Sequence, residues 1–217
     1  MSNQTINNLI SIQEDIKKNN DLNKVKIVAV TKTFSMEKIK PLIDFGHIHF
    51  GENKFQEAAG KWNEQIRNNK QIKLHMIGKL QSNKAKKAVE LFHYIHSVDS
   101  QKLADVLSKS EKNVNKKLNY FIQLNIGDEN QKSGIKAKEA KQFLEYCQNE
   151  SKINVIGLMA IPPNDNKTEE YFKSLSEINT SLNLPELSMG MSNDYLLALR
   201  YKTTFIRIGS KILGERS

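Results

Sequence analysis

The sequence has 217 residues and a formal net charge of +9, and its single cysteine, Cys147, cannot form an internal disulfide. This length fits one domain with a sizeable core, and no apolar run approaches the roughly 18 residues that a membrane-spanning helix needs. Residues 1–8 are polar and lack the apolar segment of a secretory signal, so we expect a protein of the reducing cytoplasm. The lysines are dispersed rather than interleaved with aromatic residues, which argues against specific nucleic-acid recognition.

Hydrophobic periodicity predicts helices and strands that alternate along the chain. Residues 3–19 have the spacing of an amphipathic helix, and eight short apolar segments with strand character follow. The predicted strands cover residues 25–32, 47–50, 74–77, 94–96, 120–126, 155–161, 187–188 and 204–208. Helical spacing predicts helices near residues 35–45, 58–66, 83–92, 103–107, 140–147, 168–182 and 196–199, and a last turn through residue 213.

This alternation predicts an α/β fold with parallel strands and right-handed crossovers. Eight repeats in a chain of this length favour a closed (β/α)8 TIM-type barrel over an open doubly wound sheet. No Gly-x-Gly-x-x-Gly segment follows the first strand, which weakens the dinucleotide-binding alternative. We therefore predict one barrel domain over residues 1–217, with an extra helix at its amino terminus.

A barrel binds its ligands at the carboxyl ends of its strands, and Lys32 falls at such an end. The β-branched run at residues 27–30 suits a strand buried on both faces, and it stops abruptly at Lys32. A lysine that loses its proton there can attack a carbonyl and form a Schiff base. Position alone favours the simpler reading, in which Lys32 marks where the strand meets water. Six other polar or glycine-rich features share the predicted rim, namely residues 52–53, 78, 97–99, 125–127, 192 and 207–210.

The loops after the seventh and eighth strands are where barrels usually hold phosphate. Here they read Gly-Met-Ser-Asn over residues 190–193 and Gly-Ser-Lys over residues 209–211. Backbone N–H groups and the hydroxyls of Ser192 and Ser210 can satisfy phosphate oxygens. Each loop alone also fits ordinary turn and capping chemistry, whereas the pair together favours a phosphate site.

Arg207 ends the eighth predicted strand and adjoins Lys32 on the first. If the guanidinium points into the barrel, it needs an acceptor such as a ligand ring nitrogen or a carboxylate. Each of the two cations disfavours protonation of the other, so Arg207 helps to keep Lys32 nucleophilic. A Schiff-base lysine, two phosphate loops and an arginine that faces a ring nitrogen together describe pyridoxal 5′-phosphate (PLP).

Several segments carry a family resemblance, and they cover the chain from about residue 25 to its end. They are residues 28–32, 50–57, 75–84, 96–100, 123–127, 157–162, 187–192 and 206–214. With these segments the chain resembles the pyridoxal phosphate homeostasis proteins, which are related to the barrel domain of alanine racemase. It departs from the family pattern at Thr31, Lys79, Asn193 and residues 201–203, which bear on the fine tuning of the pocket.

The resemblance implies a role for each candidate cofactor-binding residue. By it, Lys32 carries PLP as a Schiff base, Asn53 lies beside the ring, and Arg207 meets the pyridine nitrogen. The phosphate would be held by Ser192, Gly209 and Ser210. An arginine does not protonate the ring nitrogen, so the cofactor is a poorer electron sink and carbanion chemistry is discouraged.

The implied function is intracellular PLP homeostasis and amino-acid and keto-acid balance, without an established turnover. The expected partners are PLP and apo PLP-dependent enzymes, with no membrane and no metal, and the family suggests a monomer. The alternative is a PLP-dependent racemase of the alanine racemase type. Such enzymes need a base on each face of the substrate carbon and take the second, a tyrosine, from a separate β domain. We expect this chain to lack that domain, since it ends at Ser217. A barrel enzyme that uses Lys32 on a sugar phosphate is the third possibility.

The remaining titratable residues are weaker candidates. The five histidines, at positions 47, 49, 75, 93 and 96, show no trustworthy metal motif, and structural roles are favoured. His75 precedes a glycine on the third strand and could line the pocket. Glu52 and Asp99 could act as general acids or bases, although Asp99 with Ser97 and Ser100 reads as a helix cap.

Overall fold

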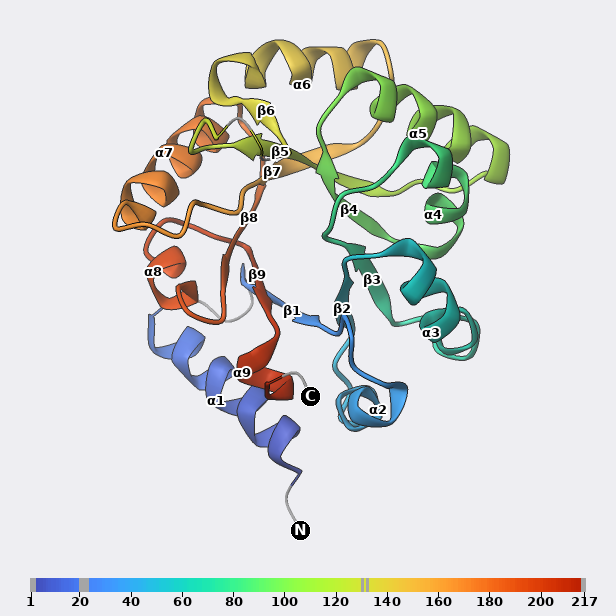
Figure 1. The fold of residues 1–217 in the computed structure, drawn as a ribbon, viewed down its shortest axis with the longest axis vertical. Helices are drawn as coiled ribbons and strands as arrows, with labels where there is room; N and C mark the ends of the chain where they lie inside the picture. The colour runs from blue at the N-terminus through green and yellow to red at the C-terminus, as the bar shows by residue number, and fades with distance from the viewer. Residues whose placement is uncertain (1–2, 20–23, 130, 132, 216–217) are drawn as a thin grey trace.

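A computed structural model describes residues 3–19, 24–129, 131 and 133–215. Its strands form a nine-stranded sheet in which a pairing between β4 and β5 closes the ring and leaves the short β6 outside it (Figure 1). All pairings are parallel. The barrel strands are β1 (Lys26–Val30), β2 (His49–Glu52), β3 (Lys73–Met76), β4 (Tyr94–Val98), β5 (Asn119–Asn125), β7 (Val155–Met159), β8 (Glu186–Met191) and β9 (Phe205–Ile208). The predicted (β/α)8 barrel is therefore confirmed.

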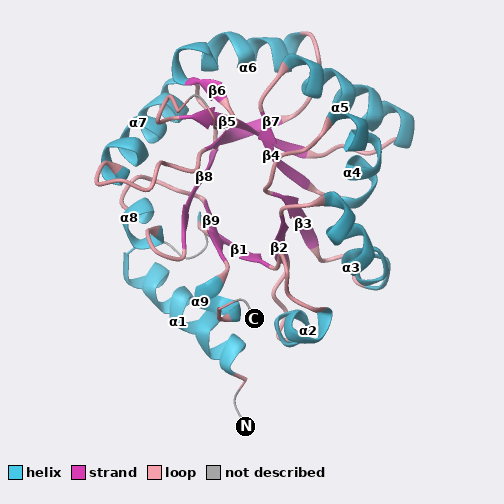
Figure 2. Ribbon diagram, viewed as in Figure 1, coloured by secondary structure: helices cyan, strands magenta, loops and turns pink. Residues whose placement is uncertain are grey.

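Helices surround the barrel on its outside (Figure 2). They are α1 (Gln4–Asn19), α2 (Met36–Asp44), α3 (Phe55–Asn68), α4 (Ala85–Leu91), α5 (Gln101–Val114), α6 (Ala140–Asn149), α7 (Thr168–Ser181), α8 (Tyr195–Leu199) and α9 (Ser210–Leu213). Short 3-10 turns, Ser82–Lys84 and Ala137–Glu139, precede α4 and α6. Within the described part of the chain, none of these helices is long and apolar enough to cross a membrane.

The apolar core has two layers because successive side chains of a strand point to opposite faces. On β1, Ile27 and Ala29 belong to the large layer between strands and helices, whereas Val28 belongs to a small inner cluster with Phe205. The large layer also buries Cys147 fully, as its helical spacing predicts. The side chains on both faces of β1 are therefore packed in the core. This packing fixes the position of the strand and of Lys32, which follows it by two residues.

Several strands differ from the prediction: β1 and β7 each end two residues earlier than predicted, and three further differences are larger. β2 lies two residues later than predicted, because Glu52 is fully buried as part of the strand. β8 includes residues 189–191, which were expected to form a loop. β6 (Ile135–Lys136) was not predicted, since a two-residue strand has no detectable period.

The amino-terminal helix α1 packs beside α8 and α9 (Figure 1). Its buried face includes Leu9, Ile12 and Ile16, in agreement with the predicted amphipathic helix. The Tyr195 hydroxyl of α8 donates to Asp15 Oδ2 at 2.6 Å, and Asn8 Nδ2 donates to the carbonyl of Ile212 in α9 at 3.1 Å. The added helix therefore supports the two short helices that follow the predicted phosphate loops.

Candidate functional site

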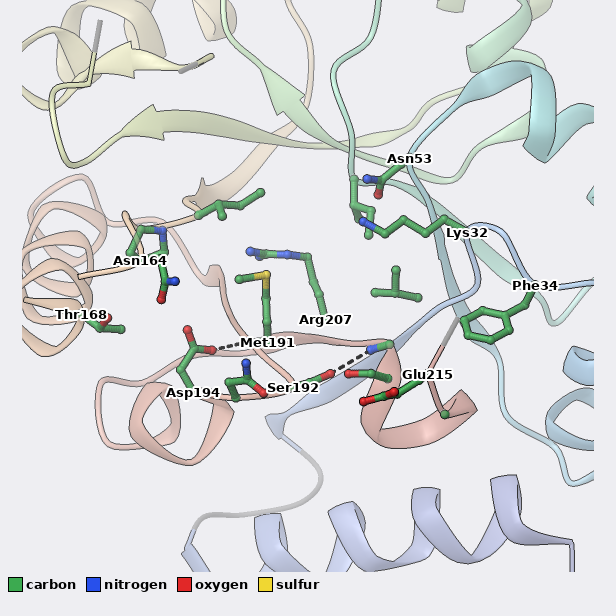
Figure 3. Close-up of a pocket in the computed structure, with 18 of the residues that line it drawn as sticks. Lys32, Phe34, Asn53, Asn164, Thr168, Met191, Ser192, Asp194, Arg207 and Glu215 are labelled. Carbon is green, nitrogen blue, oxygen red and sulfur yellow. Dashed lines mark hydrogen bonds between the residues drawn. The ribbon is translucent and has the colours of Figure 1, made fainter. Parts of the chain in front are cut away.

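A pocket of about 700 Å³ opens at the carboxyl ends of the barrel strands (Figure 3). Such a volume suits a small-molecule ligand. All six residues that the sequence nominates for cofactor binding line it, namely Lys32, Asn53, Ser192, Arg207, Gly209 and Ser210. They come from β9, from the loops after β1, β2, β8 and β9, and from the start of α9, so the closed barrel brings distant segments to one place.

The loop between β7 and α7 forms a wall that the sequence did not nominate. Its lining residues are Ile161, Pro162, Pro163, Asn164 and, at the start of α7, Thr168. Prolines and apolar residues after a strand carry no distinctive chemical signal. Their only hint was position, since they follow the carboxyl end of a barrel strand.

Two predicted rim glycines support the pocket from behind rather than lining it. A Cβ on Gly78 would lie 2.3 Å from the carbonyl oxygen of Asn53, and a Cβ on Gly127 would lie 2.3 Å from Pro163 Cγ. Side chains at these positions would displace residues that do line the pocket. Neither glycine, nor the predicted segment 97–99, is among the described residues of the lining.

Lys32 follows a residue that is anchored to a buried ion pair. Glu52 Oε1 accepts hydrogen bonds from Thr31 Oγ1 at 2.7 Å, Lys61 Nζ at 2.9 Å and Trp62 Nε1 at 2.9 Å. Lys61 Nζ also donates to the carbonyl of Thr31 at 2.8 Å. Glu52 thus holds the Lys32 loop in place instead of acting as an acid or base in the pocket.

The residue after Lys32 is held as well, in a conformation that a β-branched side chain rarely adopts. Thr33 has φ +69°, in the left-handed region, and its N–H donates to Glu57 Oε1. Partial burial raises the pKa of Glu57, but hydrogen bonds from the Thr33 N–H and from Lys61 outweigh it and leave the pKa lowered. Because both neighbours are fixed, the backbone of Lys32 has little freedom, and its side chain extends into the pocket (Figure 3).

The two glycine-containing loops meet around the hydroxyl of Ser192. Ser192 Oγ accepts from the backbone N–H groups of Gly209 at 3.3 Å and Lys211 at 3.5 Å. Gly190, two residues before Ser192, lets this loop pass close to α8, because its φ is +91° and a Cβ there would lie 2.7 Å from Ala198 Cβ. The N–H groups and the Ser192 and Ser210 hydroxyls form a donor cluster that suits an anion.

Arg207 places a buried cation at the floor of the pocket, where it is 3% exposed. Its Nη1 donates to Ser188 Oγ at 2.7 Å, and its Nη2 donates to the carbonyl of Ala160 at 2.9 Å. Burial lowers the pKa of Arg207 to about 10, although the charge of Asp194 opposes the shift, so the group stays protonated at neutral pH. A guanidinium has five N–H groups, and donors therefore remain for a ligand.

Two further candidates lie outside the pocket. His75 is completely buried inside the barrel, between His49 and His96, so its predicted place in the lining is wrong. The cap of α5 is Ser100, whose Oγ accepts from the Leu103 N–H at 3.3 Å. Asp99 precedes that cap, and burial raises its pKa.

The pocket suits PLP both in its volume and in the chemical groups that line it. The cofactor has an aldehyde, a phosphate and a pyridine ring, which call for an amine, several anion donors and a group that faces the ring nitrogen. The lining offers Lys32, the donor cluster around Ser192, and Arg207 in that order. Val30 and Ile77 add apolar surface for the faces of a ring.

Comparison with known proteins points to the same chemistry. Residues 7–217 match the family model for the alanine racemase N-terminal domain. The chain is 37% identical over 202 residues to the pyridoxal phosphate homeostasis protein of Pasteurella multocida, covering 88% of this chain and 87% of that protein. It is 35% identical to the protein of the same name from Haemophilus influenzae, covering 97% and 95%.

Solved structures give the same result at the level of the fold. PipY of Synechococcus elongatus PCC7942, solved with PLP bound, matches with a TM-score of 0.87 and 31% identity over 97% of this chain and all of that one. An alanine racemase of Clostridium difficile matches with a TM-score of 0.74 at 14% identity, over 96% of this chain and 56% of the racemase. That second likeness concerns the barrel fold alone.

Proposed function

The chain belongs to the family of pyridoxal phosphate homeostasis proteins, and we propose that it serves intracellular PLP homeostasis by binding PLP in the pocket at the top of its barrel. The observation that carries this proposal is the meeting of Lys32, Arg207 and two phosphate-type loops in one pocket. Each feature alone has an ordinary explanation, whereas their combination matches one cofactor. The functional unit is the single barrel domain.

In this proposal each lining residue has a defined task. Lys32 binds the cofactor covalently, since PLP supplies an aldehyde that reacts reversibly with amines. Ser192, Gly209 and Ser210 bind the phosphate, and Asn53 lies beside the ring. Arg207 donates a hydrogen bond to the pyridine nitrogen and keeps it unprotonated, because a guanidinium can only donate.

An unprotonated ring nitrogen favours storage over turnover. The electron demand of the ring is what stabilises carbanions on amino-acid ligands, and it falls when the nitrogen carries no proton. We therefore assign the protein to holding and delivering PLP, and to amino-acid and keto-acid balance through the level of free cofactor. The recipients are apo forms of PLP-dependent enzymes, and the protein works as a cytoplasmic monomer.

A transfer experiment tests this function. Protein loaded with PLP and freed of excess cofactor is mixed with an apo PLP-dependent enzyme, and the return of that enzyme's activity is followed with time. We expect reactivation to continue when a PLP phosphatase destroys free cofactor. Reactivation that stops with the phosphatase would show that the protein only releases PLP into solution. The oligomeric state is measured on the same sample by light scattering.

Loss of the phosphate donors should weaken PLP retention strongly. Each hydrogen bond to a charged group contributes about 1.5–3 kcal/mol, so the double variant Ser192→Ala/Ser210→Ala should bind PLP on the order of 100-fold more weakly. Equilibrium dialysis measures the affinity. Ser181→Ala is the matched control, because that hydroxyl is exposed on α7 and donates to the carbonyl of Ile178. Equal affinity in the double variant and in the wild type would refute the assigned phosphate site.

A further inference from the structure

A line of hydrogen-bonded side chains runs through the inside of the barrel and ends on Arg207. His49 Nδ1 is 2.9 Å from His75 Nε2, and His75 Nδ1 is 2.9 Å from His96 Nε2. His96 Nδ1 is 2.9 Å from Ser188 Oγ, which accepts from Arg207 Nη1 at 2.7 Å. We call His49, His75, His96 and Ser188 the relay. It joins the amino-terminal end of β2 to the floor of the pocket.

The chemistry of arginine gives the relay a direction. A guanidinium only donates, so Ser188 must accept from Arg207 and pass its own proton to His96 Nδ1. His96 then donates from Nε2 to His75, and His75 donates from Nε2 to His49. In the opposite direction the Ser188 proton would have no acceptor, since Arg207 and His96 are the partners of this hydroxyl within the described part of the chain. All three histidines are therefore Nε2–H tautomers.

The surroundings keep the relay neutral. His75 stacks on Tyr94 with ring centroids 4.2 Å apart, and His96 stacks on Phe121 at the same distance. Burial lowers the pKa of His75 and His96 well below the usual range, and like charges on neighbouring side chains lower it further. Burial also lowers the pKa of His49 to about 4.

Other titratable groups face the relay mainly at its His49 end. They are His47, Lys26, Lys73 and His93, which all disfavour a positive charge on His49. Lys26 is itself paired with Glu186 Oε1 at 2.8 Å. At the other end the facing charge is Arg207. Burial lowers the pKa of His47 and His93 to about 4 as well, so the charges that face the relay histidines at neutral pH are the positive ones of Lys26, Lys73 and Arg207, and the neutral form of the relay is the stable one.

A neutral, directed relay can accept a hydrogen bond from Arg207 without placing a negative charge beside it, which a carboxylate could not do. A buried cation needs acceptors, and a carboxylate partner would cancel the charge of Arg207. In the relay each ring turns a lone pair toward Arg207 and its N–H away, so the aligned dipoles stabilise the cation without adding a negative charge to that of Asp194. The guanidinium is also held in one orientation by bonds to Ser188 and to the carbonyl of Ala160.

We propose that the relay of His49, His75, His96 and Ser188 positions Arg207 and preserves its charge toward the ring nitrogen of PLP. The relay residues are positioning residues, since they act through Arg207 and do not line the pocket. The proposal rests on the proposed PLP function and adds a specific role for a buried polar core. It implies that a substitution at His75, two hydrogen bonds away from Ser188, alters the affinity and the absorbance of bound PLP.

Two substitutions at His75 separate hydrogen bonding from packing. His75→Phe keeps an aromatic ring on Tyr94 but removes both hydrogen bonds, whereas His75→Gln can still accept and donate. We expect PLP affinity to fall about tenfold in His75→Phe, with a shifted absorbance maximum of the bound cofactor, and to return within about threefold of the wild type in His75→Gln. A His75→Phe protein with wild-type affinity and spectrum overturns the proposal. So does a glutamine variant that behaves like the phenylalanine variant.

A second measurement needs neither a variant nor the cofactor. Long-range proton–nitrogen correlation spectra of the 15N-labelled apo protein report the tautomer of each imidazole. The relay predicts neutral Nε2–H forms for His49, His75 and His96, and an Nδ1–H form at His75 or His96 would contradict it. If the wild type fails to bind PLP, the proposed function is lost, whereas the tautomers still decide whether the relay exists.

Discussion

Replacing Lys32 with alanine is expected to abolish the covalent attachment of PLP and to weaken its binding on the order of 100-fold, about 2.7 kcal/mol. The phosphate loops and Arg207 remain in that variant, so weak noncovalent binding should persist. Equilibrium dialysis gives the affinity. Reduction with borohydride followed by mass spectrometry shows whether PLP is fixed to the peptide that contains residue 32.

The control for this variant is Lys54→Ala. Lys54 is exposed and follows Asn53, so it tests whether any lysine near the rim can trap the cofactor. We expect wild-type affinity and full labelling at Lys32 in this control. Undiminished covalent labelling in Lys32→Ala, at Lys54 or at another lysine, would contradict the assignment of Lys32.

The largest loss of stability is expected for Glu52→Ala. The Glu52 side chain is fully buried and is the shared acceptor of Lys61, Thr31 and Trp62, so the substitution removes three buried hydrogen bonds and leaves Lys61 with Glu57 as its remaining carboxylate. Such a loss costs about 3 kcal/mol or more of the free energy of unfolding. Because Thr31 and Trp62 lose their acceptor as well, PLP affinity should fall together with stability. Urea denaturation at neutral pH measures the first effect.

Two comparisons make the Glu52 experiment decisive. Asp44→Ala removes an exposed ion pair with Lys40 on α2 and should change stability by less than about 0.5 kcal/mol. The double variant Glu52→Leu/Lys61→Met replaces both buried charges and should recover part of the lost stability, while Thr31 and Trp62 still lack their acceptor. If Glu52→Ala is no more harmful than Asp44→Ala, the ion pair does not anchor the Lys32 loop.

The barrel was predictable because its signal is repeated. Apolar runs such as residues 27–30 alternate with amphipathic helices along the chain, and an error at one element does not change the pattern. The shift of β2 shows the limit of this signal. Glu52 looks like a loop residue, and its burial depends on three donors, Thr31 from the loop after β1 and Lys61 and Trp62 from α3.

The chemistry of the pocket was predictable where a charged residue stands shortly after or within an otherwise apolar strand, which is uncommon. Lys32 closely follows β1 and Arg207 lies near the end of β9, and the resemblance implies a role for each. The support around them was not predictable. The left-handed backbone of Thr33 and the partners of Lys61 depend on how the loop after β1 meets α3.

The relay is another case in which the sequence shows the residues but not the contacts between them. His75 and His96 lie on neighbouring strands, and their contact depends on the register in which His75 pairs with Tyr94. An alternating pattern identifies them as inward or outward but gives no register between strands. For that reason the histidines looked like separate structural residues, although their hydrogen bonds connect them to the floor of the pocket.

The most direct test of the proposed function is the absorbance spectrum of the purified wild-type protein, before and after PLP is added and excess cofactor removed. We expect a visible band of a lysine-bound cofactor, distinct from that of free PLP and retained through gel filtration at one PLP per chain. A spectrum that shows only protein absorbance after filtration would contradict PLP binding. The pocket would then belong to another anionic ligand.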